Sequence, residues 1–80
     1  MKYYIQDSRG YVGNCLSFWR PEGKGYTTNI NDAGLFTKEE AERICKNRDS
    51  DIAWREDYIK SHTQLTVDSQ YIDRAFKVMF

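Results

Sequence analysis

The sequence predicts an α+β fold: a small antiparallel sheet of three to four strands with one central helix, and a second helix at the carboxyl end as one interpretation of the tail. Strand-forming runs alternate with turn-forming residues over the first thirty positions. A helix-start signal follows at Thr37. The 80 residues suffice for a single domain (1–80), and aromatic residues, 15% of the chain, can fill so small a core.

Two strands are expected before the single proline. Residues 2–6 and 15–20 are rich in strand formers, whereas residues 7–14 contain two turn signals and predict a wide connection between the strands. Side chains alternate between the two faces of a strand. Leu16 and Phe18 are therefore expected on one face, with Trp19 on the other and partly exposed.

A third strand is expected after a turn. Residues 21–25 contain the proline and two glycines, which is turn chemistry. Residues 26–30 then resume a strand-forming composition, so residues 15–30 predict an antiparallel hairpin. Tyr26, Thr28 and Ile30 would share one face of that strand.

A helix is predicted over residues 38–48. Thr37 and Glu40 have the spacing of a capping box, in which each side chain bonds the other residue's backbone amide. Phe36 precedes the cap and Ala41 follows it at the spacing of a hydrophobic staple. We expect Ala41 and Ile44 to be buried, because they lie on the apolar stripe of this helix.

The second half gives weaker signals. Residues 52–60 fit a short helical turn, and residues 63–67 have the composition of a later strand. Apolar residues in 69–80 recur every three to four positions, which fits an amphipathic helix capped by Asp68 or Ser69. The competing interpretation is a terminal strand with alternating residues on one face, namely Phe76, Val78 and Phe80.

Charge, hydropathy and cysteine content give no indication of a nucleic-acid-binding, membrane or zinc protein. Twelve basic residues balance twelve acidic ones, so net charge indicates neither nucleic acid nor an anionic membrane as partner. No apolar run has the ~20 residues of a membrane span. Cys15, Cys45 and His62 cannot form a four-ligand zinc site. We expect buried, reduced thiols and a cytoplasmic location, with no membrane association.

The residues that could suggest catalysis have simpler explanations. Gly23 and Gly25 lack the third glycine of a dinucleotide loop, because position 28 is Thr28, and they suit a hairpin turn. His62 has no nucleophile motif near it and fits a surface loop. We therefore expect no catalytic residue, no metal and no cofactor, and hence a protein that is not an enzyme.

Two kinds of binding surface are compatible with the remaining residues. Protein interfaces are enriched in Trp, Tyr and Arg, which predicts a partner-binding set of Trp19, Arg20, Tyr26 and Trp54. The alternative is a single-stranded nucleic-acid site, because aromatic rings stack on bases and cations neutralise phosphates. Its predicted residues are Lys2, Tyr4, Arg9, Tyr11 and Lys24.

Short segments throughout the chain carry a family resemblance. In the first half these are Tyr4 to Asp7, Tyr11-Val12-Gly13-Asn14, Phe18-Trp19, Gly25-Tyr26-Thr27-Thr28, Ala33 with Phe36-Thr37, and Glu39-Glu40-Ala41. In the second half they are Asp51-Ile52 with Trp54, Tyr58-Ile59, and Asp68 with Gln70-Tyr71. With these segments the chain resembles a family of short phage and prophage proteins of uncertain role.

The resemblance implies a function by analogy of size and source. Small phage proteins often disarm host defences by binding, and some anti-CRISPR proteins are similar in length and composition. The implied protein acts in the bacterial cytoplasm and inhibits a host defence complex, either a protein or a ribonucleoprotein, by stoichiometric occlusion of a surface. The resemblance assigns no site residue and no oligomeric state.

Overall fold

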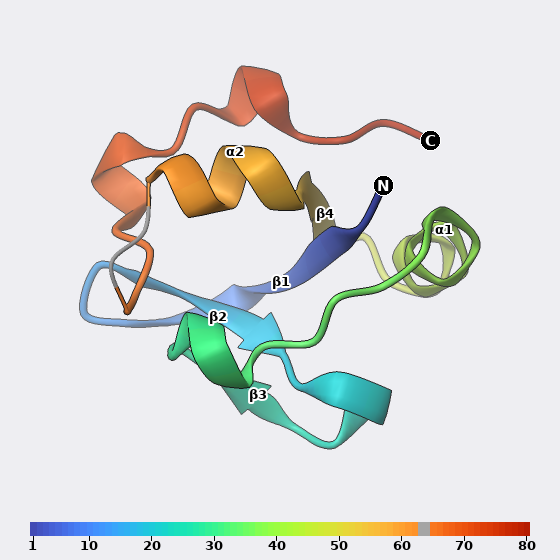
Figure 1. Cartoon of the computed structure of the whole chain (residues 1–80), viewed down its shortest axis with the longest axis horizontal. Coiled ribbons are helices and arrows are strands. Elements are labelled where there is room, and N and C mark those ends of the chain that lie inside the picture. Colours follow the sequence, from blue (N-terminus) through green and yellow to red (C-terminus); the bar gives the residue numbers. More distant parts are fainter. Residues whose placement is uncertain (63–64) are drawn as a thin grey trace.

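A computed structural model describes residues 1–62 and 65–80, and it has the α+β architecture (Figure 1). Its antiparallel sheet has four strands in the order β3-β2-β1-β4. The strands are β1 (Tyr3–Val12), β2 (Cys15–Trp19), β3 (Tyr26–Thr27) and β4 (Asp51–Arg55). The α-helices are α1 (Lys38–Asn47) and α2 (Glu56–Ser61), and single 3-10 turns occur at Pro21–Gly23, Ile30–Asp32, Ser69–Tyr71 and Arg74–Phe76.

The two faces of the sheet bury separate clusters of side chains, because neighbouring residues of a strand point to opposite faces. Tyr4 and Trp54 belong to a cluster that is completed by Ile59 of α2 and by Val67. Ile5 belongs to a second cluster, which includes residues of α1. Figure 1 shows α2 and the carboxyl-terminal segment on one side of β1. The start of β1 is thus buried on both faces.

β1 is longer than the sequence predicts. The expected wide connection over residues 7–14 is wrong, because β1 continues to Val12 and joins β2 through a two-residue turn. Gly13 occupies the first turn position with φ 60°, a conformation that glycine adopts without strain. The register shifts between the pairs Gln6–Phe18 and Tyr11–Leu16, so the predicted break is a bulge within one strand.

β2 agrees with its prediction, but the third strand is shorter than predicted. Leu16 and Phe18 are buried, and Trp19 is partly exposed on the other face. β3 contains only Tyr26 and Thr27, so the expected shared face of Tyr26, Thr28 and Ile30 does not form. The reason is local: the side chain of Asn29 accepts a hydrogen bond from the amide of Asn31 and starts a 3-10 turn.

The fourth strand comes from a segment without a clear strand signal. Residues 51–55 form β4 where a helical turn was expected, and that turn begins only at Glu56. Of the predicted strand at 63–67, residues 63 and 64 lie outside the described part, and Leu65 and Thr66 are not in a strand. The carbonyl of Val67 accepts a hydrogen bond from the amide of Leu16, beside the bridge between Cys15 and Asp68.

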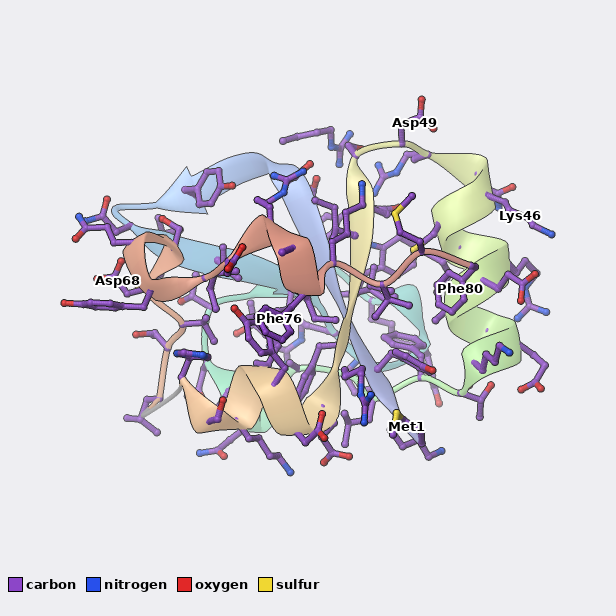
Figure 2. The ribbon with its side chains drawn as sticks, turned by 90° about the horizontal axis from the view of Figure 1, so that it is seen from above. Met1, Lys46, Asp49, Asp68, Phe76 and Phe80 are labelled. Atoms are coloured by element: carbon purple, nitrogen blue, oxygen red, sulfur yellow. The ribbon has the colours of Figure 1, made fainter. Side chains whose placement is uncertain are left out.

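The tail is neither the predicted helix nor the alternative strand. Asp68 does act as a cap, but of one 3-10 turn, and Asp73 caps a second turn through the amide of Ala75. Figure 2 shows Phe76 over α2 and Phe80 beside α1, so the segment crosses the sheet. Phe76 stacks on Tyr58 at a centroid distance of 4.7 Å, and the amide of Val78 bonds the carbonyl of Ala53.

α1 begins as predicted. The Thr37 hydroxyl accepts a hydrogen bond from the Glu40 amide at 3.2 Å, and the Glu40 carboxylate accepts one from the Thr37 amide at 2.9 Å. Ala41 is buried with Phe36 in one cluster, whereas Ile44 is only partly buried, which corrects the expectation for Ile44. No helix in the described part of the chain is both long and apolar enough to cross a bilayer.

The capping box predicts a stability effect. Thr37→Ala removes the acceptor for the Glu40 amide and should lower the free energy of unfolding by about 0.5–2 kcal/mol. About 1 kcal/mol corresponds to a melting temperature lower by roughly 4–8 °C in a domain of this size. Glu40→Ala should lower the free energy of unfolding by a smaller amount. Thr28→Ala is the control, because its hydroxyl makes no hydrogen bond to the described residues. Equal melting of the Thr37 and Thr28 variants would contradict the role of the cap.

Candidate functional site

Two carboxylates lie next to each other on adjacent strands of the sheet. Asp7 of β1 and Asp51 of β4 are directly opposite in the antiparallel register. Their side chains are 11% and 1% exposed, respectively. Like charges at opposite positions destabilise a sheet, and a buried carboxylate requires compensation. The acid pair therefore needs cations close to it.

Arg48 compensates Asp51. It follows the last residue of α1, and the Asp51 amide donates to the Arg48 carbonyl, so a tight turn brings the two side chains together. Arg48 Nε lies 3.0 Å from Asp51 Oδ2, and Arg48 Nη2 lies 2.9 Å from Oδ1. Trp19 Nε1 donates to the same Oδ1 at 3.2 Å. The hydrogen bond to Asp51 raises the pKa of Arg48.

Arg9 compensates Asp7 in the same manner. Arg9 Nε lies 2.9 Å from Asp7 Oδ1, and Nη2 lies 3.0 Å from Oδ2. Both residues lie in the part of β1 where the register shifts, so the bulge allows the side chain of Arg9 to turn back to Asp7. The side-chain hydrogen bond from Arg9 lowers the pKa of Asp7.

The phenol oxygen of Tyr26 joins the two ion pairs. It accepts a hydrogen bond from Arg48 Nη2 at 3.0 Å and one from Arg9 Nη2 at 3.3 Å. A continuous network thus connects β1, β3 and the start of β4. We call it the arginine–tyrosine cluster, and its members are Asp7, Arg9, Trp19, Tyr26, Arg48 and Asp51.

Trp19 is the apolar support of this cluster. Its ring packs edge-on against Tyr26 and Phe36, at centroid distances of 6.1 and 6.4 Å. The guanidinium carbon of Arg48 lies 5.7 Å from the centroid of the ring, within cation–π range. A Cβ atom at Gly23 would come within 3.3 Å of the ring, so glycine permits this close approach.

The outer part of the cluster reaches solvent. Tyr26 is 43% exposed, and the side chains of Arg9 and Arg48 are 54% and 34% exposed. The two carboxylates are buried beneath them. The surface therefore presents one tyrosine and two arginines that are held in place from below.

The predicted partner-binding residues divide into three groups. Trp19 and Tyr26 come together in the cluster. Arg20 is exposed, but its side chain makes no hydrogen bond or ion pair within the described part of the chain. Trp54 is fully buried, and its Nε1 donates to the oxygen of Gln6 at 2.8 Å. Including Trp54 in a surface site was therefore wrong, because its ring belongs to the core.

The residues of the nucleic-acid alternative do not form one site. Arg9 belongs to the cluster, where Asp7 already pairs with it. Lys2 and Tyr11 are exposed, and exposed Lys24 lies 3.5 Å from Glu22. Tyr4 is 2% exposed and lies in the core, so it cannot stack on a base.

Half of the cluster lies outside both predicted sets of site residues, namely Asp7, Arg48 and Asp51. Asp7 lies two residues before Arg9, and Asp51 lies three residues after Arg48. These short spacings were a readable signal for two ion pairs, although neither reveals that the pairs meet.

The other candidate residues are not members of the cluster, although the charge of Asp51 acts on the Cys45 thiol. Cys15 and Cys45 are free and partly buried, and burial raises the pKa of the Cys45 thiol. His62 is exposed at the end of α2, and its ring lies 4.9 Å from that of Tyr58. Within residues 1–62 and 65–80, no three His, Cys, Asp or Glu side chains are grouped so that they could hold a metal ion.

Removing Arg48 should destabilise the protein more than removing an exposed arginine. Arg48→Ala leaves the buried carboxylate of Asp51 without its cation. Arg55→Ala is the matched control, because Arg55 pairs with Asp57 at the surface, where ion pairs contribute little. Urea denaturation at pH 7 would measure both free energies of unfolding. A loss no greater for Arg48→Ala than for Arg55→Ala would show that the cluster does not stabilise the fold.

Asp7 should make stability depend on acid pH. Because its pKa is lower in the folded protein, the unfolded chain binds the proton more readily, and stability falls as pH drops from about 5 through the folded pKa. In urea denaturation between pH 3 and 7, Asp7→Asn should lose less stability on acidification than the wild type. Asp57→Asn, which alters a 70% exposed carboxylate, is the control. Identical pH profiles for Asp7→Asn and the wild type would contradict this effect.

Comparison of the chain with protein-family models, with curated proteins and with solved structures finds no match.

Proposed function

We propose that this chain is a non-catalytic binding protein that occupies a surface of a protein partner through the exposed side of the arginine–tyrosine cluster. The observation that supports this most is the exposure of Tyr26, Arg9 and Arg48 above buried carboxylates. Tyr, Trp and Arg are the side chains that contribute most to protein interfaces.

The network also reduces the entropic cost of binding. An arginine on a flexible surface loses rotamer freedom when it is immobilised in an interface. Here each guanidinium already makes two bonds to a carboxylate and one to Tyr26. A partner would therefore meet side chains that are already ordered.

The charges of the cluster favour a protein partner over a nucleic acid. Two aspartates balance two arginines within it, so the cluster has no excess positive charge to attract a phosphate backbone. Aromatic and arginine contacts at short range remain effective with an uncharged or mixed protein surface. Single-stranded nucleic acid remains the alternative partner, and the binding experiment below tests it.

The class of partner that we propose is taken from the sequence resemblance. Small phage proteins often disarm host defences by binding, so we propose a bacterial defence complex as the target, an anti-CRISPR-like role in the cytoplasm of the host. Inhibition would be stoichiometric, because the inhibitor blocks a surface and is not turned over.

The expected result is saturable binding of a host defence complex that depends on Tyr26. Tagged protein should recover the complex from lysates of CRISPR-containing hosts, and titration should end at a fixed molar ratio. Tyr26→Ala should weaken binding by at least about tenfold, the usual size of a hot-spot effect. Tyr71→Ala is the control, because Tyr71 is 68% exposed and its 3-10 turn lies far from β3 in Figure 1.

Other outcomes would reject this function. Recovery of no stoichiometric partner from hosts with and without CRISPR systems would contradict it, as would equal losses in the Tyr26 and Tyr71 variants. Saturable binding of a fluorescent oligonucleotide that weakens steeply with salt would favour the nucleic-acid alternative.

A further inference from the structure

Both arginines of the cluster keep hydrogen-bond donors for a ligand. A guanidinium has five N–H donors. Arg9 and Arg48 each use Nε and one Nη2 hydrogen for an aspartate, and the other Nη2 hydrogen for Tyr26. The Nη1 amino group of each has no partner among the residues that the structure describes.

The guanidinium groups of Arg9 and Arg48 are held close to one another through their Nη2 atoms. Both Nη2 atoms lie within hydrogen-bond distance of the same phenol oxygen, at 3.3 Å for Arg9 and 3.0 Å for Arg48. Like charges at this separation repel, and each aspartate forms hydrogen bonds with only one of the two arginines. An anion bound between the guanidinium groups would reduce this repulsion.

We propose that Arg9, Arg48 and Tyr26 form a receptor for a single carboxylate, supplied by an acidic side chain of the protein partner. This inference rests on the proposed function and names the group that the cluster recognises. Each guanidinium can donate an Nη1 hydrogen, so the two arginines together can bond both oxygens of one carboxylate. Tyr26 acts as a positioning residue that holds the two guanidinium groups together.

The charge balance of the cluster favours a monoanion. A carboxylate adds one negative charge above Asp7 and Asp51, whereas a phosphate adds nearly two. For a doubly charged ligand the attraction to the arginines and the repulsion from the aspartates both double, whereas the cost of removing the ligand from water rises more steeply. Binding thus depends on directed N–H donors, and a free carboxylate in solution should bind only weakly.

A peptide titration followed by NMR tests the receptor. A hexaglutamate peptide, added at low salt to the full chain, should shift the side-chain Nε–H signals of Arg9 and Arg48 saturably, and a hexaglutamine peptide should not. Tyr26→Phe keeps the ring and both ion pairs but removes the shared oxygen, so the affinity should fall about tenfold. Tyr11→Phe is the control, because Tyr11 is 47% exposed and its hydroxyl contacts Gln6.

Each outcome bears on the receptor. Saturable shifts that weaken in Tyr26→Phe and persist in Tyr11→Phe, with unchanged melting of both variants, would support it. Absence of saturable shifts at Arg9 and Arg48, or equal affinity of wild type and Tyr26→Phe, would overturn it. Tighter binding of inorganic phosphate than of the peptide would overturn the assignment to a carboxylate. A partner that binds although hexaglutamate does not would refute the receptor and leave the proposed function intact.

Discussion

The opposition of Asp7 and Asp51 is the constraint on which the surrounding structure depends. Two buried carboxylates at directly opposite positions are tolerated only when cations and hydrogen-bond donors compensate them. Arg9 and Arg48 meet this requirement from different parts of the chain. The bulge of β1 and the turn between α1 and β4 therefore satisfy the same electrostatic demand. The short strand β3 is joined to both through Tyr26.

The parts of the fold that could be predicted are those decided by neighbouring residues. The capping box depends on Thr37 and Glu40 alone, and both of its hydrogen bonds form. β4 is difficult to predict because the consecutive residues 52–54 are all buried. The segment therefore lacks the alternation of apolar and polar residues that marks a half-exposed strand. The tail has the apolar spacing of a helix, but Asp68 and Asp73 bond nearby amides and start two separate 3-10 turns.

In the candidate site, too, contacts between residues close in sequence could be predicted, and contacts between distant residues could not. Composition alone cannot distinguish Trp19 from Trp54, because the choice depends on which strand each occupies and on what covers that face. The ion pairs of Arg9 and Arg48 are short-range and readable from spacing. Their meeting at Tyr26 requires the register of β1 with β4 and the pairing of β2 with β3, which no short segment contains. The cluster is therefore a product of topology.

The edges of the sheet have a consequence for aggregation. An open edge strand offers unpaired backbone groups to other chains and can seed intermolecular sheets. On one side β3 presents only two paired residues, and the Tyr26 side chain there is bonded to two charged arginines. On the other side the amide of Val78 already occupies the carbonyl of Ala53 in β4. These contacts shorten the free edge of β3 and of β4, which should reduce the tendency of so aromatic a chain to form fibrils through them at high concentration.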